Sequence, residues 1–286
     1  MNKLKTTILK YPIISAIVIM LIGTTLTEIH LEDNVLSWMD NQKASYLTGI
    51  IEQGGVSILL MLLLAWLGML KQAGFTKPSE WKQVWLNWPI LVFFLINTDF
   101  SVLGGTNPID FSKPDLIFLF FLLYLAVGFI EEILFRGVML PLMLRKWGAT
   151  RKGIYWTVIF SSAIFGVIHI FNLIMGRYTL LASITQIIVG TCFGVYFAAC
   201  FLRNRSIWPV IITHALFDIG ANFTKIAVDS NFGVVHQTTM TNSIISILIS
   251  LPMLIYGLIL LRKVQPGQWQ EPALPMDTPS ILVSGK

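Results

Sequence analysis

The stretch YLAVGFIEEILFRGVMLPLML, residues 124–144, places three charged groups inside an otherwise apolar run. The charged residues are Glu131, Glu132 and Arg136. On insertion scales, a charge near the centre of a membrane helix costs roughly +2.5 to +3.5 kcal/mol. Charged side chains inside membrane helices are found where they face a protein interior or a water-filled cavity, and there they usually have a function. The stretch therefore predicts a polar site within the membrane.

The composition is that of a membrane protein. Hydrophobic residues make up 55% of the 286 residues and charged residues only 12%, and the mean hydropathy is +0.73. These values lie outside the range of ordinary soluble domains. The predicted fold is therefore all-α, a polytopic membrane protein of about eight transmembrane helices that enclose a buried polar cavity. The apolar segments fall near residues 9–27, 50–70, 84–104, 115–140, 155–174, 179–202, 206–224 and 242–262.

Basic residues gather in alternate connections between these segments. The basic connections contain Lys3, Lys5 and Lys10; Lys71, Lys77 and Lys82; Arg145, Lys146, Arg151 and Lys152; Arg203 and Arg205; and Arg262 and Lys263. The connections between them are acidic or nearly uncharged, and this alternation follows the positive-inside rule. We therefore expect a multi-pass protein of the plasma membrane with both termini in the cytosol. A nucleic-acid-binding protein would instead cluster its basic residues on one soluble face, and these are not so clustered.

Domain organisation is simple. Residues 1–263 are expected to form one transmembrane domain, with a motif-bearing core at about 115–225. Residues 264–286 are rich in proline and poor in apolar anchors, so we expect a disordered cytosolic tail. The first apolar segment follows several lysines without a clear cleavage site, which favours an uncleaved signal-anchor. The two cysteines, Cys192 and Cys200, match neither a metal nor a redox spacing.

Helix geometry separates the two adjacent glutamates. Glu132 and Arg136 are four residues apart and can form an ion pair on one helix face. Glu131 is rotated by about 100° from Glu132 and has no basic residue one turn ahead. It is therefore the freer carboxylate and a candidate general base. The alternative is that all three residues form a structural polar network between helices.

Two histidines lie in later apolar segments. His169 follows Phe165 by one helical turn, which is also typical of a packing histidine. His214 precedes Asp218 by four residues, so the two share a face. Asp218 could orient His214, both could ligate a metal, or both could polarise a substrate carbonyl. Structural hydrogen bonding is again the alternative to a functional role.

The joint occurrence of these groups carries more weight than any one of them. Both histidines follow the acidic motif on separate helices, which could enclose one cavity. There, Glu131 and His169 could take a proton from water, while His214 and Asp218 hold the carbonyl oxygen during attack. That chemistry is peptide hydrolysis by activated water, without a covalent intermediate.

Three short motifs carry a family resemblance. EEILFRG (131–137), FGVIH (165–169) and HALFD (214–218) resemble, in order, spacing and helical setting, the motifs of the CPBP intramembrane proteases. This is the CAAX protease and bacteriocin-processing family, also called the Abi family. The resemblance covers roughly residues 115–225 and implies a glutamate-dependent endopeptidase with eight transmembrane helices. Each motif is loose, but the ordered trio is fairly specific.

The resemblance also implies roles for single residues. Glu131 would activate water with the help of His169, and His214 with residue 218 would form the oxyanion pocket. Glu132, Arg136 and Phe165 would shape the site. The family's usual residue at 218 is asparagine, whereas this chain has Asp218. Because an ionised aspartate repels an oxyanion, Asp218 must be protonated, orient His214 instead, or mark altered activity.

Other functions remain open from the sequence. Glu131, His169, His214 and Asp218 are acceptable zinc ligands, although HExxH is absent and the resemblance implies a metal-independent mechanism with no cofactor. Members of the family also resemble bacteriocin-immunity factors or membrane scaffolds. A transporter is less favoured, because no internal repeat is present. The expected partners are the lipid bilayer and a peptide or protein substrate, such as a CAAX-like tail, lipidated or not, a bacteriocin or another membrane-associated peptide. The sequence does not indicate an oligomeric state.

Overall fold

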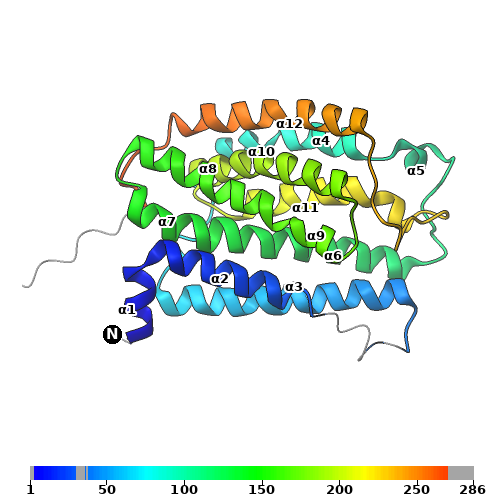
Figure 1. Ribbon diagram of the computed structural model, residues 1–286, viewed down its shortest axis with the longest axis horizontal. Coiled ribbons are helices and arrows are strands. Elements are labelled where there is room, and N and C mark those ends of the chain that lie inside the picture. Colours follow the sequence, from blue (N-terminus) through cyan, green and yellow to red (C-terminus); the bar gives the residue numbers. More distant parts are fainter. Residues whose placement is uncertain (1–2, 30–35, 37, 270–286) are drawn as a thin grey trace, which may run out of the picture.

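The computed structural model describes residues 3–29, 36 and 38–269, and this part of the chain is a bundle of helices without a β-strand. Figure 1 shows the long helices running side by side along the long axis. The helices in chain order are α1 (Lys3–Lys10), α2 (Pro12–Leu26), α3 (Asn41–Leu67), η2 (Trp81–Asn87), α4 (Pro89–Asn97), α5 (Phe100–Gly104), α6 (Pro114–Glu132), η3 (Ile133–Met139), α7 (Leu140–Trp147), α8 (Arg151–Ile168), α9 (Ile170–Ile174), α10 (Leu180–Asn204), α11 (Trp208–Asn222), η4 (Phe223–Ile226) and α12 (Met240–Leu261).

The protein is an all-α, multi-pass membrane protein, as the composition predicts. Among the described residues, five helical stretches are long and apolar enough to cross a bilayer. The pair α1 and α2, bent by 107° at its break, raises the number to six if it counts as one span. Large apolar side chains such as Ile58, Phe118 and Ile255 are more than half exposed, which suits contact with lipid.

Besides the bent pair α1 and α2, two of the expected spans form shorter helices. The segment 84–104 divides into the end of η2, the nine-residue α4 and the five-residue α5. The segment 206–224 contains α11, whose 15 residues extend about 22 Å. A hydrocarbon core is about 30 Å thick, so neither helix crosses it alone. The count of eight spans therefore stays a prediction.

Helix α10 lies at the centre of the bundle. In its apolar 18-residue stretch 61% of the residues are buried, compared with 28% in α3 and in α12. It packs against α8 and α12, while α6 packs against α3 and α11. Two glycines allow close approach: a Cβ on Gly166 of α8 would lie 2.4 Å from the Ile187 carbonyl oxygen, and one on Gly128 of α6 would lie 3.0 Å from the Ala215 amide. Small residues serve this purpose in membrane helix pairs generally.

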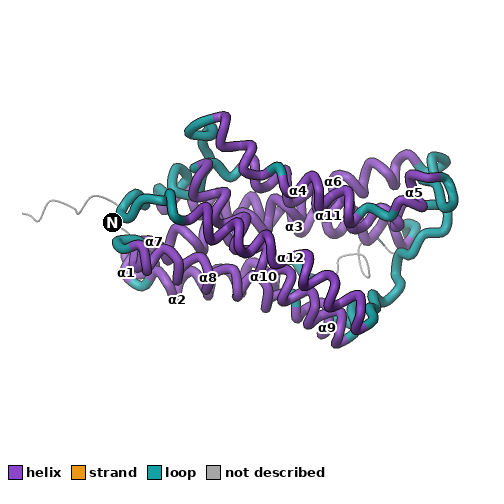
Figure 2. Tube along the Cα trace, turned by 90° about the horizontal axis from the view of Figure 1, so that it is seen from above, coloured by secondary structure: helices purple, strands orange, loops and turns teal. Residues whose placement is uncertain are grey.

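The connections gather at two ends of the bundle (Figure 2). At one end, which we call the basic end, connections 68–80, 148–150 and 205–207 meet, and the Ile207 amide donates to the Gly74 carbonyl. At the other, which we call the cavity end, connections 105–113, 175–179 and 227–239 meet. Isolated bridges there join Ile109 to Ala227 and Tyr178 to His236.

The first residues of the expected C-terminal tail pack against the basic end. Val264 is buried, the Gly267 amide donates to the Gly148 carbonyl, and the Trp269 ring lies 5.4 Å from that of Phe201. The expectation of a disordered tail at 264–286 therefore does not hold for residues 264–269, and residues 270–286 lie outside the described residues.

Candidate active site

The acidic motif lies where α6 passes into a wider turn. Glu131 and Glu132 are the last two residues of α6, and the π-helical segment η3 (Ile133–Met139) follows directly. All seven residues of η3 are buried, including Arg136. π-Helical turns are rare and occur frequently at functional sites. Here the turn holds a guanidinium inside the bundle.

Arg136 is fixed by contacts on several sides. Its Nη1 donates to Glu132 Oε1 at 2.9 Å, and its Nη2 donates to the Gly194 carbonyl of α10 at 3.2 Å. The guanidinium carbon lies 4.6 Å from the ring centre of Phe165 and 5.6 Å from that of Phe197. This confirms the expected pair between Glu132 and Arg136. The ion pair is fully buried, so the loss of either partner would leave an uncompensated charge.

Glu132 also holds His214, a contact that the sequence did not predict. Nδ1 of His214 lies 2.7 Å from Glu132 Oε1, so Nδ1–H donates to the carboxylate. The imidazole stacks on the Phe197 ring, at 5.0 Å between centres. The close approach of α6 and α11 at Gly128 allows this contact, because it brings the end of α6 beside the middle of α11.

The other nitrogen of His214 faces two more carboxylates. Nε2 lies 3.5 Å from Glu131 Oε2 and 3.7 Å from Asp218 Oδ2. The expected proximity of His214 and Asp218 is present, but at a distance longer than a good hydrogen bond. The tight partner of His214 is Glu132, so Asp218 is not the group that orients the ring most strongly.

His169 lies at the break between α8 and α9, where the regular helix ends. Its ring contacts Phe165, at 5.2 Å between centres, and its Nε2 lies 3.6 Å from where a Cβ on Gly190 would be. The absence of a side chain at Gly190 thus leaves room for the imidazole between α8 and α10.

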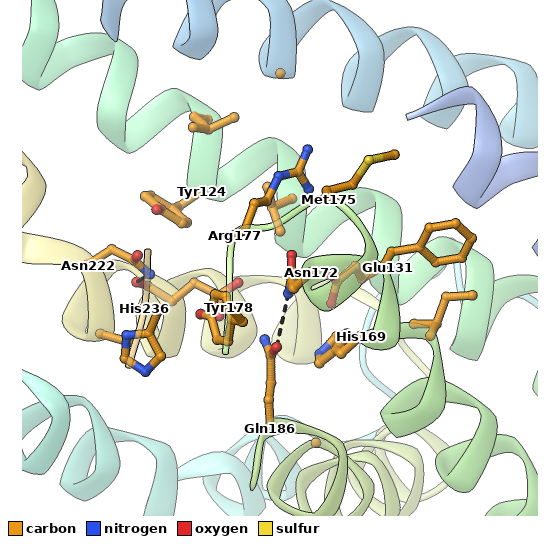
Figure 3. Close-up of a pocket in the computed structure, with 18 of the residues that line it drawn as sticks. Tyr124, Glu131, His169, Asn172, Met175, Arg177, Tyr178, Gln186, Asn222 and His236 are labelled. Atoms are coloured by element: carbon orange, nitrogen blue, oxygen red, sulfur yellow. Dashed lines mark hydrogen bonds between the residues drawn. The ribbon is translucent and has the colours of Figure 1, made fainter. Parts of the chain in front are cut away.

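One cavity of about 910 Å³ collects these groups. Glu131, Phe165, His169, His214 and Asp218 all line it, and Figure 3 shows Glu131 and His169 among its wall residues. Glu132 and Arg136 are not in its wall; Arg136 pairs with Glu132, and Glu132 in turn holds His214. The volume is within the usual range of ligand sites and suits a short stretch of peptide.

The cavity also has polar wall residues that the sequence analysis missed. The Asn172 amide donates to Gln186 Oε1 at 2.9 Å (Figure 3), and Lys225 Nζ donates to the Tyr124 hydroxyl at 3.0 Å. Burial lowers the pKa of the Lys225 ammonium, while the nearby charge of Asp218 opposes this. Gln186 could have been noticed, because an amide in an apolar segment is itself a sign of a polar interior.

The geometry does not provide a preformed zinc site. Within the described part of the chain, no three His, Cys, Asp or Glu side chains are arranged to hold a metal ion. His214 is instead engaged through Nδ1 by a carboxylate that also binds Arg136.

The comparison with protein families points the same way as the motifs. Residues 113–220 match the family model described as type II CAAX prenyl endopeptidase Rce1-like. The matched range contains all three motifs, from Glu131 to Asp218, and most of the cavity's inner wall.

The match to the Rce1-like family model agrees with the resemblance carried by the three motifs, and it supports an intramembrane protease with a peptide or protein substrate in general. Comparison with curated proteins and with solved structures gave no match.

Proposed function

We propose that this protein is a glutamate-dependent intramembrane endopeptidase that hydrolyses a peptide bond with an activated water. The observation that carries the proposal is the shared cavity, in which Glu131, His169, His214 and Asp218 meet although they come from three segments of the chain. The match of residues 113–220 to the Rce1-like family model supports an intramembrane protease in general.

Glu131 is the proposed general base. Its carboxylate lines the cavity, whereas the carboxylate of Glu132 is engaged by Arg136 and His214. Water held between Glu131 and His169 would give its proton to Glu131 while its oxygen forms a bond to the carbonyl carbon. The proton then passes to the amide nitrogen as the C–N bond breaks, which yields a free acid and a free amine.

His214 is the proposed oxyanion donor. Because Nδ1–H is held by Glu132, a proton on Nε2 points toward the cavity. There it can donate a hydrogen bond to the substrate carbonyl oxygen, which gains negative charge during attack by water. The buried Glu132 carboxylate favours that second proton, since it stabilises the imidazolium. His214 would thus act as a preorganised cationic donor.

Asp218 is proposed to be protonated when the oxyanion forms. Its Oδ2 lies beside His214 Nε2, so an ionised carboxylate would compete with the oxyanion for that donor. A protonated Asp218 would instead donate a second hydrogen bond to the oxyanion, as the side-chain amide of an asparagine would. This interpretation accommodates the departure from the family pattern without loss of activity.

The test is cleavage of peptides by the purified, detergent-solubilised protein. A mixed unprenylated library and a prenylated CAAX peptide would each be incubated with wild type, Glu131→Gln and His169→Ala, with and without a strong chelator. We expect cleavage by wild type that is indifferent to chelator and is lost in both variants. Cleavage that disappears with chelator would instead indicate a zinc hydrolase. A protein whose biological effect survives Glu131→Gln would be a scaffold or an immunity factor.

A further inference from the structure

The cavity has its outlet at the cavity end of the bundle. Its outer wall includes Glu28, Arg177 and Tyr178, Lys225, and residues 231–236. Lys225 lies in η4 and the others lie in connections between helices, where Val234 is 69% exposed. Among the described residues that line the cavity, none comes from connections 68–80, 148–150 or 205–207 at the basic end. Apolar core residues of η3 and α7 lie between the site and that end.

The two ends differ sharply in charge. The basic end carries fourteen Lys or Arg residues, whereas the cavity end carries four. The fourteen are Lys3, Lys5, Lys10, Lys71, Lys77, Lys82, Arg145, Lys146, Arg151, Lys152, Arg203, Arg205, Arg262 and Lys263. The four are Lys43, Lys113, Arg177 and Lys225. Of these, Lys43 pairs with Asp115, Lys113 with Asp110 and Arg177 with Glu28, so three are neutralised locally.

Positive charge of this kind sets membrane orientation, because connections rich in Lys and Arg remain in the cytosol. All of these connections are shorter than the length at which the rule weakens. We infer that the basic end faces the cytosol and that the catalytic cavity opens on the extracytosolic face. The substrate is then a peptide segment presented from that face. The inference rests on the proposed function for the nature of the substrate, but the orientation rests on charge and geometry alone.

Exposed tryptophans place the basic end at a membrane interface. Trp81 and Trp85 are 73% and 69% exposed at the basic end, and Phe111 is 76% exposed at the cavity end. Exposed tryptophans beside lysines are typical of the headgroup level. The cavity mouth lies at the opposite end of the bundle, so it meets water on the other side of the membrane. A peptide tail in the cytosol would have the buried layer of η3 and α7 between it and Glu131.

Cysteine labelling in intact cells tests the orientation. Both native cysteines are buried, so a membrane-impermeant maleimide should not label the wild-type chain, which serves as the negative control. Val234→Cys places a thiol at the cavity mouth, and Lys152→Cys places one at the basic end; both positions are exposed. In spheroplasts of a bacterial host, we expect labelling of Val234→Cys before lysis and of Lys152→Cys only after lysis. The reverse pattern, or equal labelling of both, would overturn the orientation.

A second arm tests the substrate side. The unprenylated peptide library, which does not cross the membrane, would be added outside intact spheroplasts that carry wild type or Glu131→Gln. Cleavage by wild type alone supports the inference. Cleavage that appears only after lysis overturns it and leaves the peptidase activity standing. If labelling shows an outward mouth but the purified protein cleaves nothing, the orientation holds and the proposed function fails.

Discussion

Oε1 of Glu132 is shared by His214 Nδ1 at 2.7 Å and by Arg136 Nη1 at 2.9 Å. One buried carboxylate oxygen thereby joins the π-helical turn of η3 to the middle of α11. The other oxygen, Oε2, is buried without a hydrogen-bond partner in the described structure. The carboxylate therefore has its stabilising contacts concentrated on one side, and the position of His214 depends on them.

Removal of the charge at Glu132 should therefore damage both stability and catalysis. Glu132→Gln leaves the Arg136 guanidinium buried without its counterion, a change that typically costs about 3–5 kcal/mol of unfolding free energy. The double variant Glu132→Leu/Arg136→Met removes both charges and should recover much of the lost thermal stability. It should still lack activity, because His214 then loses the hydrogen bond that fixes its Nδ1. Peptide cleavage at the wild-type kcat by a stable double variant would contradict the positioning role of Glu132.

Asp218→Asn should keep or raise the cleavage rate. An asparagine amide donates without a proton having to be bound, so the oxyanion pocket no longer depends on protonation of residue 218. Asp218→Leu should lower kcat by roughly tenfold to a hundredfold, in proportion to one lost charge-assisted hydrogen bond of about 1.5–3 kcal/mol. If Asp218→Asn abolishes cleavage in a folded protein, the ionised form of Asp218 is needed and the proposed protonation is wrong.

The contact between α6 and α11 should be sensitive to a single methyl group. A Cβ at Gly128 would lie 3.0 Å from the Ala215 amide and 3.2 Å from the Ile211 carbonyl oxygen, both of them backbone atoms. Gly128→Ala should thus push the helices apart, at a cost of about 1–3 kcal/mol for overpacking, and should reduce activity by displacing His214 from Glu132. Gly55→Ala on α3, with no atom within 4 Å of the new Cβ, is the matched control. We would measure the melting temperature and the cleavage rate of both variants. Equal values for Gly128→Ala and Gly55→Ala would contradict the importance of the close contact between α6 and α11.

Acid should destabilise the connection at the cavity end through His236. Burial lowers the pKa of His236, and the nearby positive charge of Lys225 lowers it further. The unfolded chain then binds a proton more readily than the folded one, so stability is fully present above the unfolded pKa of about 6.5 and declines as the pH falls below it. His236→Phe retains an aromatic ring against Tyr178 but cannot titrate. Between pH 8 and pH 5.5, the melting temperature of wild type should fall further than that of the variant; equal falls would exclude His236 as a contributor.

The sequence predicts the members of the site better than their contacts. Glu132 and Arg136 pair because both lie on one helix at a spacing that follows from local geometry. The bond between Glu132 and His214 joins residues 82 positions apart, so it depends on how α6 and α11 pack. The same local reasoning favours Asp218 as the partner of His214, yet their separation is 3.7 Å, while Glu132 is at 2.7 Å.

Apolar composition also predicts spans better than it predicts helix ends. In the segment 84–104, Pro89 begins α4 and the chain leaves the helical conformation at Thr98, so the apolar run does not form one long helix. The π-helical turn of η3 has no distinct sequence signal, because its residues read as ordinary membrane helix. The outlet of the cavity could not be located either, since its wall combines three connections that are distant in sequence: those after α2, after α9 and after η4.

The most direct test of the account compares kcat/KM for wild type and Glu131→Gln, with chelator present throughout. The substrate is the library peptide that wild type cleaves fastest. Glutamine preserves the shape of residue 131 but cannot accept a proton from water, so general-base catalysis worth about 10²–10⁴-fold should be lost. The melting temperature of the variant should stay near that of wild type, because Glu131 is not the carboxylate that pairs with Arg136. A folded Glu131→Gln protein that cleaves the peptide at the wild-type rate would contradict the claim that Glu131 activates the water.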